Sequence, residues 1–180
     1  MHQYPYVIDG TMLYFGLRSR IIRSLFLRPN QLSKENSRMS KTVLFPTDFS
    51  EVSLRVLDTF VELKVMGVDK VILFHVVDER SFQVVETYTS LKDIEKKSMD
   101  RAHAELEKMA QKLRDQGFTV IPKIEVGIPV REILQAEKDD EVSLIVLGSH
   151  GRSNLADIFI GSVAEKVIRK CTKSVFVVKR

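Results

Sequence analysis

Five short apolar runs, separated by segments with helical periodicity, constrain the fold of this 180-residue chain more than any other feature. Strands that alternate with helices form a parallel sheet, and continuous apolar strands fit a sheet that is covered on both faces. We therefore expect an α/β fold with an open, doubly wound, Rossmann-like sheet of five parallel strands. The five runs are Lys41–Pro46, Val71–Val77, Phe118–Val126, Val142–Leu147 and Ser174–Lys179.

The segments between these runs repeat apolar residues at the spacing of amphipathic helices. Ser50 is a candidate cap for the first helix, and Gly67 and Gly117 follow the last periodic residues of the first two helices. Pro129 fits the first turn of a short helix, where proline is tolerated. The expected helices cover residues 52–64, residues 90–116, a short segment from Pro129 and residues 162–170.

The N-terminal segment differs from the rest of the chain in charge. Residues 1–40 hold six basic and two acidic residues, which accounts for the whole net charge of +4. The main body is neutral, so the basic balance does not indicate a nucleic-acid-binding domain. We expect residues 1–39 to be a mis-assigned start or a disordered extension, and residues 40–180 to be the functional domain. A membrane-surface helix over Leu17–Leu27 or a transit peptide remain alternatives for the extension.

Composition excludes several classes of protein. No apolar run approaches the roughly 18–20 residues that span a bilayer, so we expect no membrane span. The single cysteine, Cys171, excludes an internal disulfide framework and a cysteine-rich zinc site. Such a chain suits a reducing compartment, and we expect a cytoplasmic location.

A glycine-rich segment after the fourth apolar run carries the clearest functional signal. Open parallel sheets bind ligands beyond the carboxyl ends of their strands, where the strand order reverses. If the first strand is central, this point lies after Pro46 and after Leu147. There, Gly148-Ser149-His150-Gly151 is followed by nine residues and then by Gly161-Ser162 at a helix start. Backbone amides at such a helix start attract anions, so the segment predicts a phosphate-binding site that is neither a Walker loop nor a GxGxxG motif.

Four segments together resemble the universal stress protein family over roughly residues 40–180. They are Lys41–Ser50, His75-Val76-Val77-Asp78, Val126-Gly127-Ile128-Pro129 and the glycine-rich segment. The last of these is similar to the G-x2-G-x9-G-[ST] motif of the ATP-binding branch. The resemblance implies the strand order 3-2-1-4-5 and a homodimer joined through the C-terminal strand, Val175–Val178.

The resemblance also implies a set of nucleotide contacts. Asp48 would face the nucleoside end of ATP, Val76 would meet the adenine, and Mg or Mn would be carried by the phosphates. Ala164 departs from relatives that carry a hydroxyl residue there, which leaves one phosphate contact open. The residues implied to surround the ligand are Pro46, Thr47, Asp48, Val76, Gly148, Ser149, His150, Gly151, Arg152, Gly161, Ser162 and Val163.

Plainer interpretations of these residues exist. Asp48 could cap the helix that begins near Ser50, and His75 could be a histidine at the end of a buried strand. The segment supplies phosphate donors but no evident catalytic base besides Asp48, so we expect no catalytic residues and no metal-ligating side chains. The favoured function is a nucleotide-dependent regulatory homodimer of the stress response with an unknown protein partner. The alternatives are a slow ATP hydrolase or phosphoryl-transfer enzyme, and a ligand-free dimeric scaffold.

Overall fold

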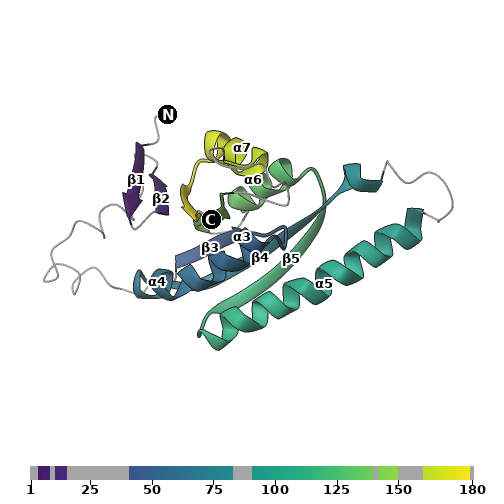
Figure 1. Cartoon of the computed structure of the whole chain (residues 1–180), viewed down its shortest axis with the longest axis horizontal. Coiled ribbons are helices and arrows are strands. Elements are labelled where there is room, and N and C mark those ends of the chain that lie inside the picture. The colour runs from purple at the N-terminus through teal and green to yellow at the C-terminus, as the bar shows by residue number, and fades with distance from the viewer. Residues whose placement is uncertain are drawn as a thin grey trace, which may run out of the picture.

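A parallel sheet of five strands forms the centre of the fold (Figure 1). The computed structural model describes residues 4–8, 11–15, 41–82, 91–139, 142–149 and 160–178. Its parallel strands lie in the order β5-β4-β3-β6-β7, which is the expected order 3-2-1-4-5. The fold class is therefore confirmed. The strands are β3 (Lys41–Pro46), β4 (Val68–Asp78), β5 (Thr119–Gly127), β6 (Val142–Gly148) and β7 (Ser174–Val178).

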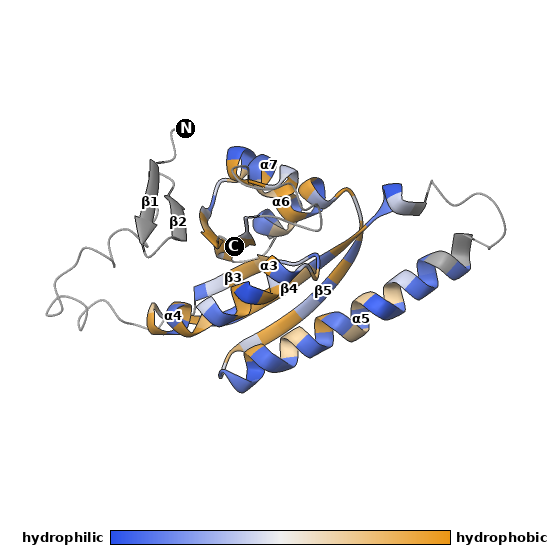
Figure 2. Cartoon of the chain, viewed as in Figure 1, coloured by the Kyte–Doolittle hydropathy of each residue, from blue (hydrophilic) through white to orange (hydrophobic). Residues whose placement is uncertain are grey.

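Helices cover both faces of this sheet because successive side chains of each buried strand point to opposite faces. Val43 and Phe45 of β3 pack in one core with α4 (Phe60–Val65) and α5 (Leu91–Asp115). Leu44, between them, packs in a second core with α6 (Pro129–Asp139) and α7 (Ser162–Lys170). The hydropathy colouring follows this arrangement, with apolar strands enclosed by helices of mixed character (Figure 2).

The first expected helix is interrupted. It consists of α3 (Glu51–Arg55), the 3-10 turn η2 (Val56–Thr59) and α4. The Thr59 hydroxyl donates to the Val56 carbonyl at 2.7 Å, and such side-chain bonds to the backbone compete with regular helix geometry. The apolar spacing predicted the buried face, but it does not register this change of helix type.

The long helix α5 carries a buried stripe that includes Ala102, Leu106 and Leu113. Charged residues occupy its outer face, as expected of a solvated amphipathic helix. Across the described ranges, no helix combines the length and apolar character needed to cross a membrane.

The N-terminal segment contributes two further strands to the sheet. Strands β1 (Tyr4–Ile8) and β2 (Thr11–Phe15) pair with each other, and β2 pairs with β7 in antiparallel fashion. The register places Met12 opposite Val177. The strand expected to join two copies therefore has β2 of its own chain along its outer edge. The division at residue 39, with its interpretation as a mis-assigned start, stays a prediction.

Candidate functional site

A cavity of about 480 Å³ lies at the carboxyl ends of β3, β4 and β6. The N-terminus of α7 closes one side of the cavity, and Ser98 and Arg101 of α5 line another. Strands β4 and β6 flank β3, so the cavity lies at the reversal of strand order where open parallel sheets bind ligands. Its volume is in the range of about 300–1,000 Å³ that is typical of small-molecule sites.

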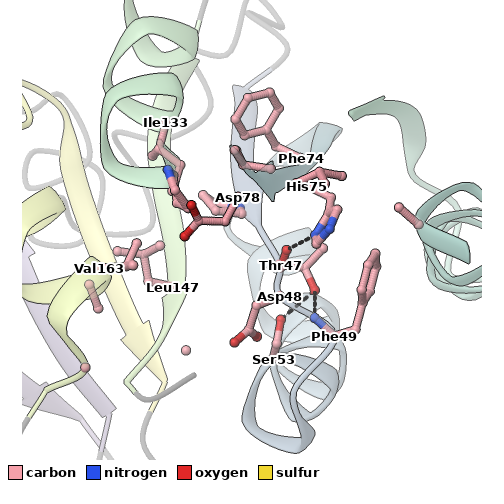
Figure 3. A pocket seen from close by; sticks show the side chains of 18 of the residues that line it. Thr47, Asp48, Phe49, Ser53, Phe74, His75, Asp78, Ile133, Leu147 and Val163 are labelled. Atoms are coloured by element: carbon pink, nitrogen blue, oxygen red, sulfur yellow. Dashed lines mark hydrogen bonds between the residues drawn. The ribbon is translucent and has the colours of Figure 1, made fainter. Parts of the chain in front are cut away.

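The loop after β3 forms one wall and is held by the side chain of Thr47. The Thr47 hydroxyl accepts from the Phe49 N–H at 3.1 Å and from the Ser53 hydroxyl at 2.7 Å. It donates in turn to the sulfur of Met109, 3.5 Å away on α5. Thr47 is buried, so this network fixes the loop from within (Figure 3).

His75 joins β4 to the same loop. Its Nδ1 lies 2.7 Å from the Thr47 carbonyl oxygen, which only accepts, so Nδ1 carries the proton. The imidazole stacks on the Phe49 ring with centroids 4.2 Å apart. Phe49 has a φ of 62°, which an aromatic residue rarely adopts. Backbone strain of this kind persists where the surroundings over-determine the conformation, and it clusters at ligand sites.

Asp48 is not the cap of the helix, so that interpretation is wrong, but it has a local role beside its position at the cavity. Its Oδ1 accepts from the Ser50 N–H at 3.1 Å, so it stabilises the turn before α3. The N-cap itself is Ser50, whose hydroxyl accepts from the Ser53 N–H at 3.3 Å. Asp48 also lines the cavity, as Figure 3 shows. Its local role in the turn therefore coexists with a position at the wall of the cavity.

The opposite wall is the N-terminus of α7. Gly161 is the N-cap and provides no side-chain hydrogen bond to the helix. The amides of the first helical turn have no partner within the helix, so they present donors and a partial positive charge to the cavity. The Gly161 N–H itself donates to the Ser149 carbonyl at 2.6 Å. This bond joins the two ends of the segment between β6 and α7.

Most of the residues implied by the resemblance come together in this cavity. Ser149 is not among the lining residues; it is buried, with its N–H donating to the Val178 carbonyl at 2.8 Å. His150, Gly151 and Arg152 lie outside the described residues. The residues that line the cavity are Pro46, Thr47, Asp48, Val76, Gly148, Gly161, Ser162 and Val163.

Sequence reasoning missed part of the cavity. Ser98 and Arg101 line it from α5, and Ile133 lines it from α6. No local signal distinguishes Arg101 from the other charges of a solvated helix. Only the packing of α5 along the sheet brings this residue to the cavity, so the sequence pattern alone could not have found it.

One ion pair sets the electrostatics at the end of β4. Arg80 Nε lies 2.8 Å from Asp78 Oδ1, and its Nη2 lies 2.5 Å from Oδ2. The hydrogen bonds from Arg80 hold the pKa of the Asp78 carboxyl below its ordinary value. The same pair raises the pKa of Arg80. Asp78 therefore lines the cavity as a carboxylate at neutral pH.

Side chains alone do not provide a metal centre in the described part of the chain. Within the described ranges, no three residues among His, Cys, Asp and Glu are grouped so that they could hold a metal ion. A divalent ion at this cavity would need oxygen ligands from a bound ligand and from water, as Mg²⁺ commonly does.

Comparison with known proteins supports the fold and shows the family of the chain. The model of the universal stress protein family matches residues 39–179. Universal stress protein MJ0577 of Methanocaldococcus jannaschii is 37% identical over 158 residues, which cover 80% of this chain and 98% of that protein. Universal stress protein YxiE of Bacillus subtilis is 29% identical over 149 residues, covering 78% of this chain and 100% of that protein. A solved structure of MJ0577 superimposes with a TM-score of 0.71 at 42% identity, covering 79% of this chain and 97% of that one.

Proposed function

Because the chain belongs to the universal stress protein family, we propose that it binds ATP and acts as a nucleotide-dependent regulator in a stress response. The observation that carries this proposal is that most of the predicted contact residues line a single cavity. Eight of the twelve, among them Asp48, Val76 and Ser162, line one space of about 480 Å³. Chance would not gather residues from three distant parts of the chain around a cavity of suitable size.

The two walls suit the two ends of the nucleotide. Val76 is half-buried near the loop after β3, where an apolar side chain suits a base. Ser162 and Val163 lie at the start of α7, where main-chain amides and the helix dipole favour phosphates. We assign the adenine to the first wall and the phosphates to the second. We propose that His150, Gly151 and Arg152, which lie outside the described residues, contact the phosphates as well.

Regulation rather than rapid catalysis fits this set of groups. Hydrolysis needs a positioned water, a base and charge stabilisation around the γ-phosphate. Asp48 and Asp78 are the carboxylates that line the cavity. In this assignment Asp48 lies at the nucleoside end, and Asp78 is held in an ion pair by Arg80. Mg or Mn would be carried by the phosphate oxygens and water, with no protein ligand. We propose that nucleotide binding changes a surface of the protein that a protein partner in the cytoplasm binds.

The homodimer belongs to this proposal. Pairing through Val175–Val178 would close an apolar edge strand, since open edges tend to pair with another copy. Because β2 lies along the same edge, the dimer forms only when β2 leaves β7. The N-terminal segment and a second copy would thus compete for one row of backbone donors and acceptors.

Labelled ATP tests the function directly. Equilibrium dialysis of the full chain with radiolabelled ATP and Mg²⁺ should show saturable binding close to one nucleotide per chain. Phosphate release should then stay below about 1 per second, the low end of ordinary enzyme rates. No saturable binding would reject the proposal and leave the ligand-free scaffold. Steady turnover above that rate would favour the ATP hydrolase or phosphoryl-transfer enzyme.

A further inference from the structure

A second cavity, of about 500 Å³, lies between α6 and α7 and continues from the first. Pro129, Ser162 and Val163 line both cavities. The start of α7 is therefore a common rim, with the proposed nucleotide site on one side and this groove on the other. The two helices pack side by side over the same face of the sheet (Figure 1).

The groove is lined by cations. Arg80, Arg131, Lys138, Lys166 and Lys170 contribute to its walls, and no carboxylate residue is among its lining residues. Clefts lined by charges of one sign concentrate the field and attract the opposite charge. The groove is therefore built for an anion.

Three of these cations have no acidic partner among the residues that the structure describes. Arg80 is paired with Asp78, and Arg131 Nε lies 2.8 Å from Glu132 Oε1. Lys138, Lys166 and Lys170, by contrast, form no ion pair with any residue that the structure describes. Lys166 and Lys170 are four residues apart on α7, where like charges repel. A polyanion in the groove would relieve this repulsion.

The direction of the side chains connects the groove to the rim. Side chains of a helix lean toward its N-terminus, so Lys166 lies over the first turn that begins at Ser162. The main-chain rise from Ser162 to Lys166 is only about 6 Å at 1.5 Å per residue. An anion that leaves the start of α7 on the groove side reaches Lys166 next. On the α6 wall, Arg131 is paired with Glu132, which leaves Lys138 as the α6 cation that is without an ion pair among the described residues.

We propose that the groove binds the distal phosphates of a nucleotide whose phosphate chain is longer than that of ATP. This inference rests on the proposed function and specifies its ligand class: an adenine nucleoside polyphosphate with four or more phosphates. The first three phosphates occupy the start of α7, and the additional ones continue along the groove between Lys138 and Lys166.

The test compares ATP, adenosine 5′-tetraphosphate and adenosine 5′-pentaphosphate on the full chain by calorimetric titration. Affinity should rise along the series, by about fivefold or more from ATP to the pentaphosphate, because two lysine–phosphate contacts are gained. The double variant Lys138→Gln/Lys166→Gln should lose this gain while its affinity for ATP changes little. Gln preserves helix propensity, and both lysines are exposed, so the fold should be kept. Lys112→Gln, an equal loss of charge at an exposed position of α5, should keep the full gain.

Results that contradict the inference show whether the groove inference alone is wrong or the proposed function as well. If ATP binds but the longer nucleotides bind no better, or if the double variant keeps their advantage, the groove inference is wrong and the proposed function stands. If ATP itself does not bind, both fall. Inorganic tripolyphosphate serves as the third arm. Binding of this anion tighter than that of adenosine pentaphosphate would assign the groove to free polyphosphate and overturn the nucleotide inference.

Discussion

His75 donates from Nδ1 to the Thr47 carbonyl across 2.7 Å, and this bond joins the end of β4 to the loop after β3. The two strands are neighbours in the sheet, yet the residues are 28 positions apart in sequence. A wall of the cavity thus depends on a buried polar contact between strand ends. The same imidazole supports Phe49 in its left-handed conformation.

Replacing His75 should destabilise the loop after β3. We expect His75→Phe to lower the free energy of unfolding by about 1–3 kcal/mol, because a buried carbonyl loses its donor while an aromatic ring is kept. ATP affinity should fall as well, since Thr47 and Phe49 line the cavity. Urea unfolding measures the first effect and dialysis the second. His103→Phe, the same change at an exposed position of α5, is the control. Equal stability of His75→Phe and the native chain would contradict this role of the bond.

Introducing a carboxylate at the start of α7 should weaken ATP binding without lowering the stability of the fold. Ser162 is exposed and follows the N-cap Gly161. Ser162→Asp should keep or slightly raise the melting temperature, because an acidic residue in the first turn is favourable by about 0.3–1 kcal/mol. The same charge should weaken ATP binding about tenfold or more by repelling the phosphates.

The matched variant Ser162→Ala removes the hydroxyl without adding charge, and it should weaken ATP binding far less. Melting curves and ATP titrations of both variants provide the comparison. If a folded Ser162→Asp protein binds ATP with the native affinity, the phosphates do not bind at the start of α7.

Glu137 offers a test of stability that does not depend on the ligand. Its side chain is 1% exposed, and its Oε1 accepts from the Thr172 N–H at 3.0 Å and from the hydroxyl at 3.3 Å. Glu137→Ala removes a buried side chain and the acceptor of the Thr172 N–H, so we expect a loss of about 1–3 kcal/mol in urea unfolding. Glu95→Ala, at an exposed position of α5, should change stability by less than about 0.5 kcal/mol. Equal losses in the two variants would show that the contact to Thr172 contributes nothing.

The ion pair at the end of β4 predicts a pH dependence. Hydrogen bonds from Arg80 lower the pKa of Asp78 from its ordinary 3.8. Because folding lowers this pKa, the pair stabilises the protein above the ordinary value, and the contribution is lost as the pH falls through the lowered value. NMR titration of the carboxyl should give a higher pKa for Asp78 in Arg80→Gln. Arg169→Gln, which breaks a pair on α7 instead, should leave it unchanged. An unaltered pKa in Arg80→Gln would assign the shift to another group.

Competition for the edge of β7 predicts a change of oligomeric state. With β2 along Val175–Val177, a second copy has no free edge of β7 to join. Deleting residues 1–39 should therefore shift the protein toward a dimer in sedimentation velocity experiments. If the full chain and the shortened chain show the same state, the N-terminal strands do not control access to this edge.

The sequence predicted those features that depend on local apolar pattern and on glycine spacing. Strand Lys41–Pro46 and helix Ser162–Lys170 have the bounds expected of them, because turn and cap residues mark both ends. The 3-10 turn Val56–Thr59 was not predicted, since the spacing of apolar residues does not distinguish the two helix types. Arg101 and the bond from Gly161 to Ser149 were not predicted either, because both depend on how distant segments pack.

The most direct test of the nucleotide site is an NMR titration of the isotope-labelled full chain with ATP and Mg²⁺. We predict saturable shifts of the amide signals of Val76 and Val163, on opposite walls of the cavity, while Lys112 at the far end of α5 stays unchanged. Amides of Val76 and Val163 that do not move at saturating ATP, or shifts confined to residues outside the cavity, would contradict the account.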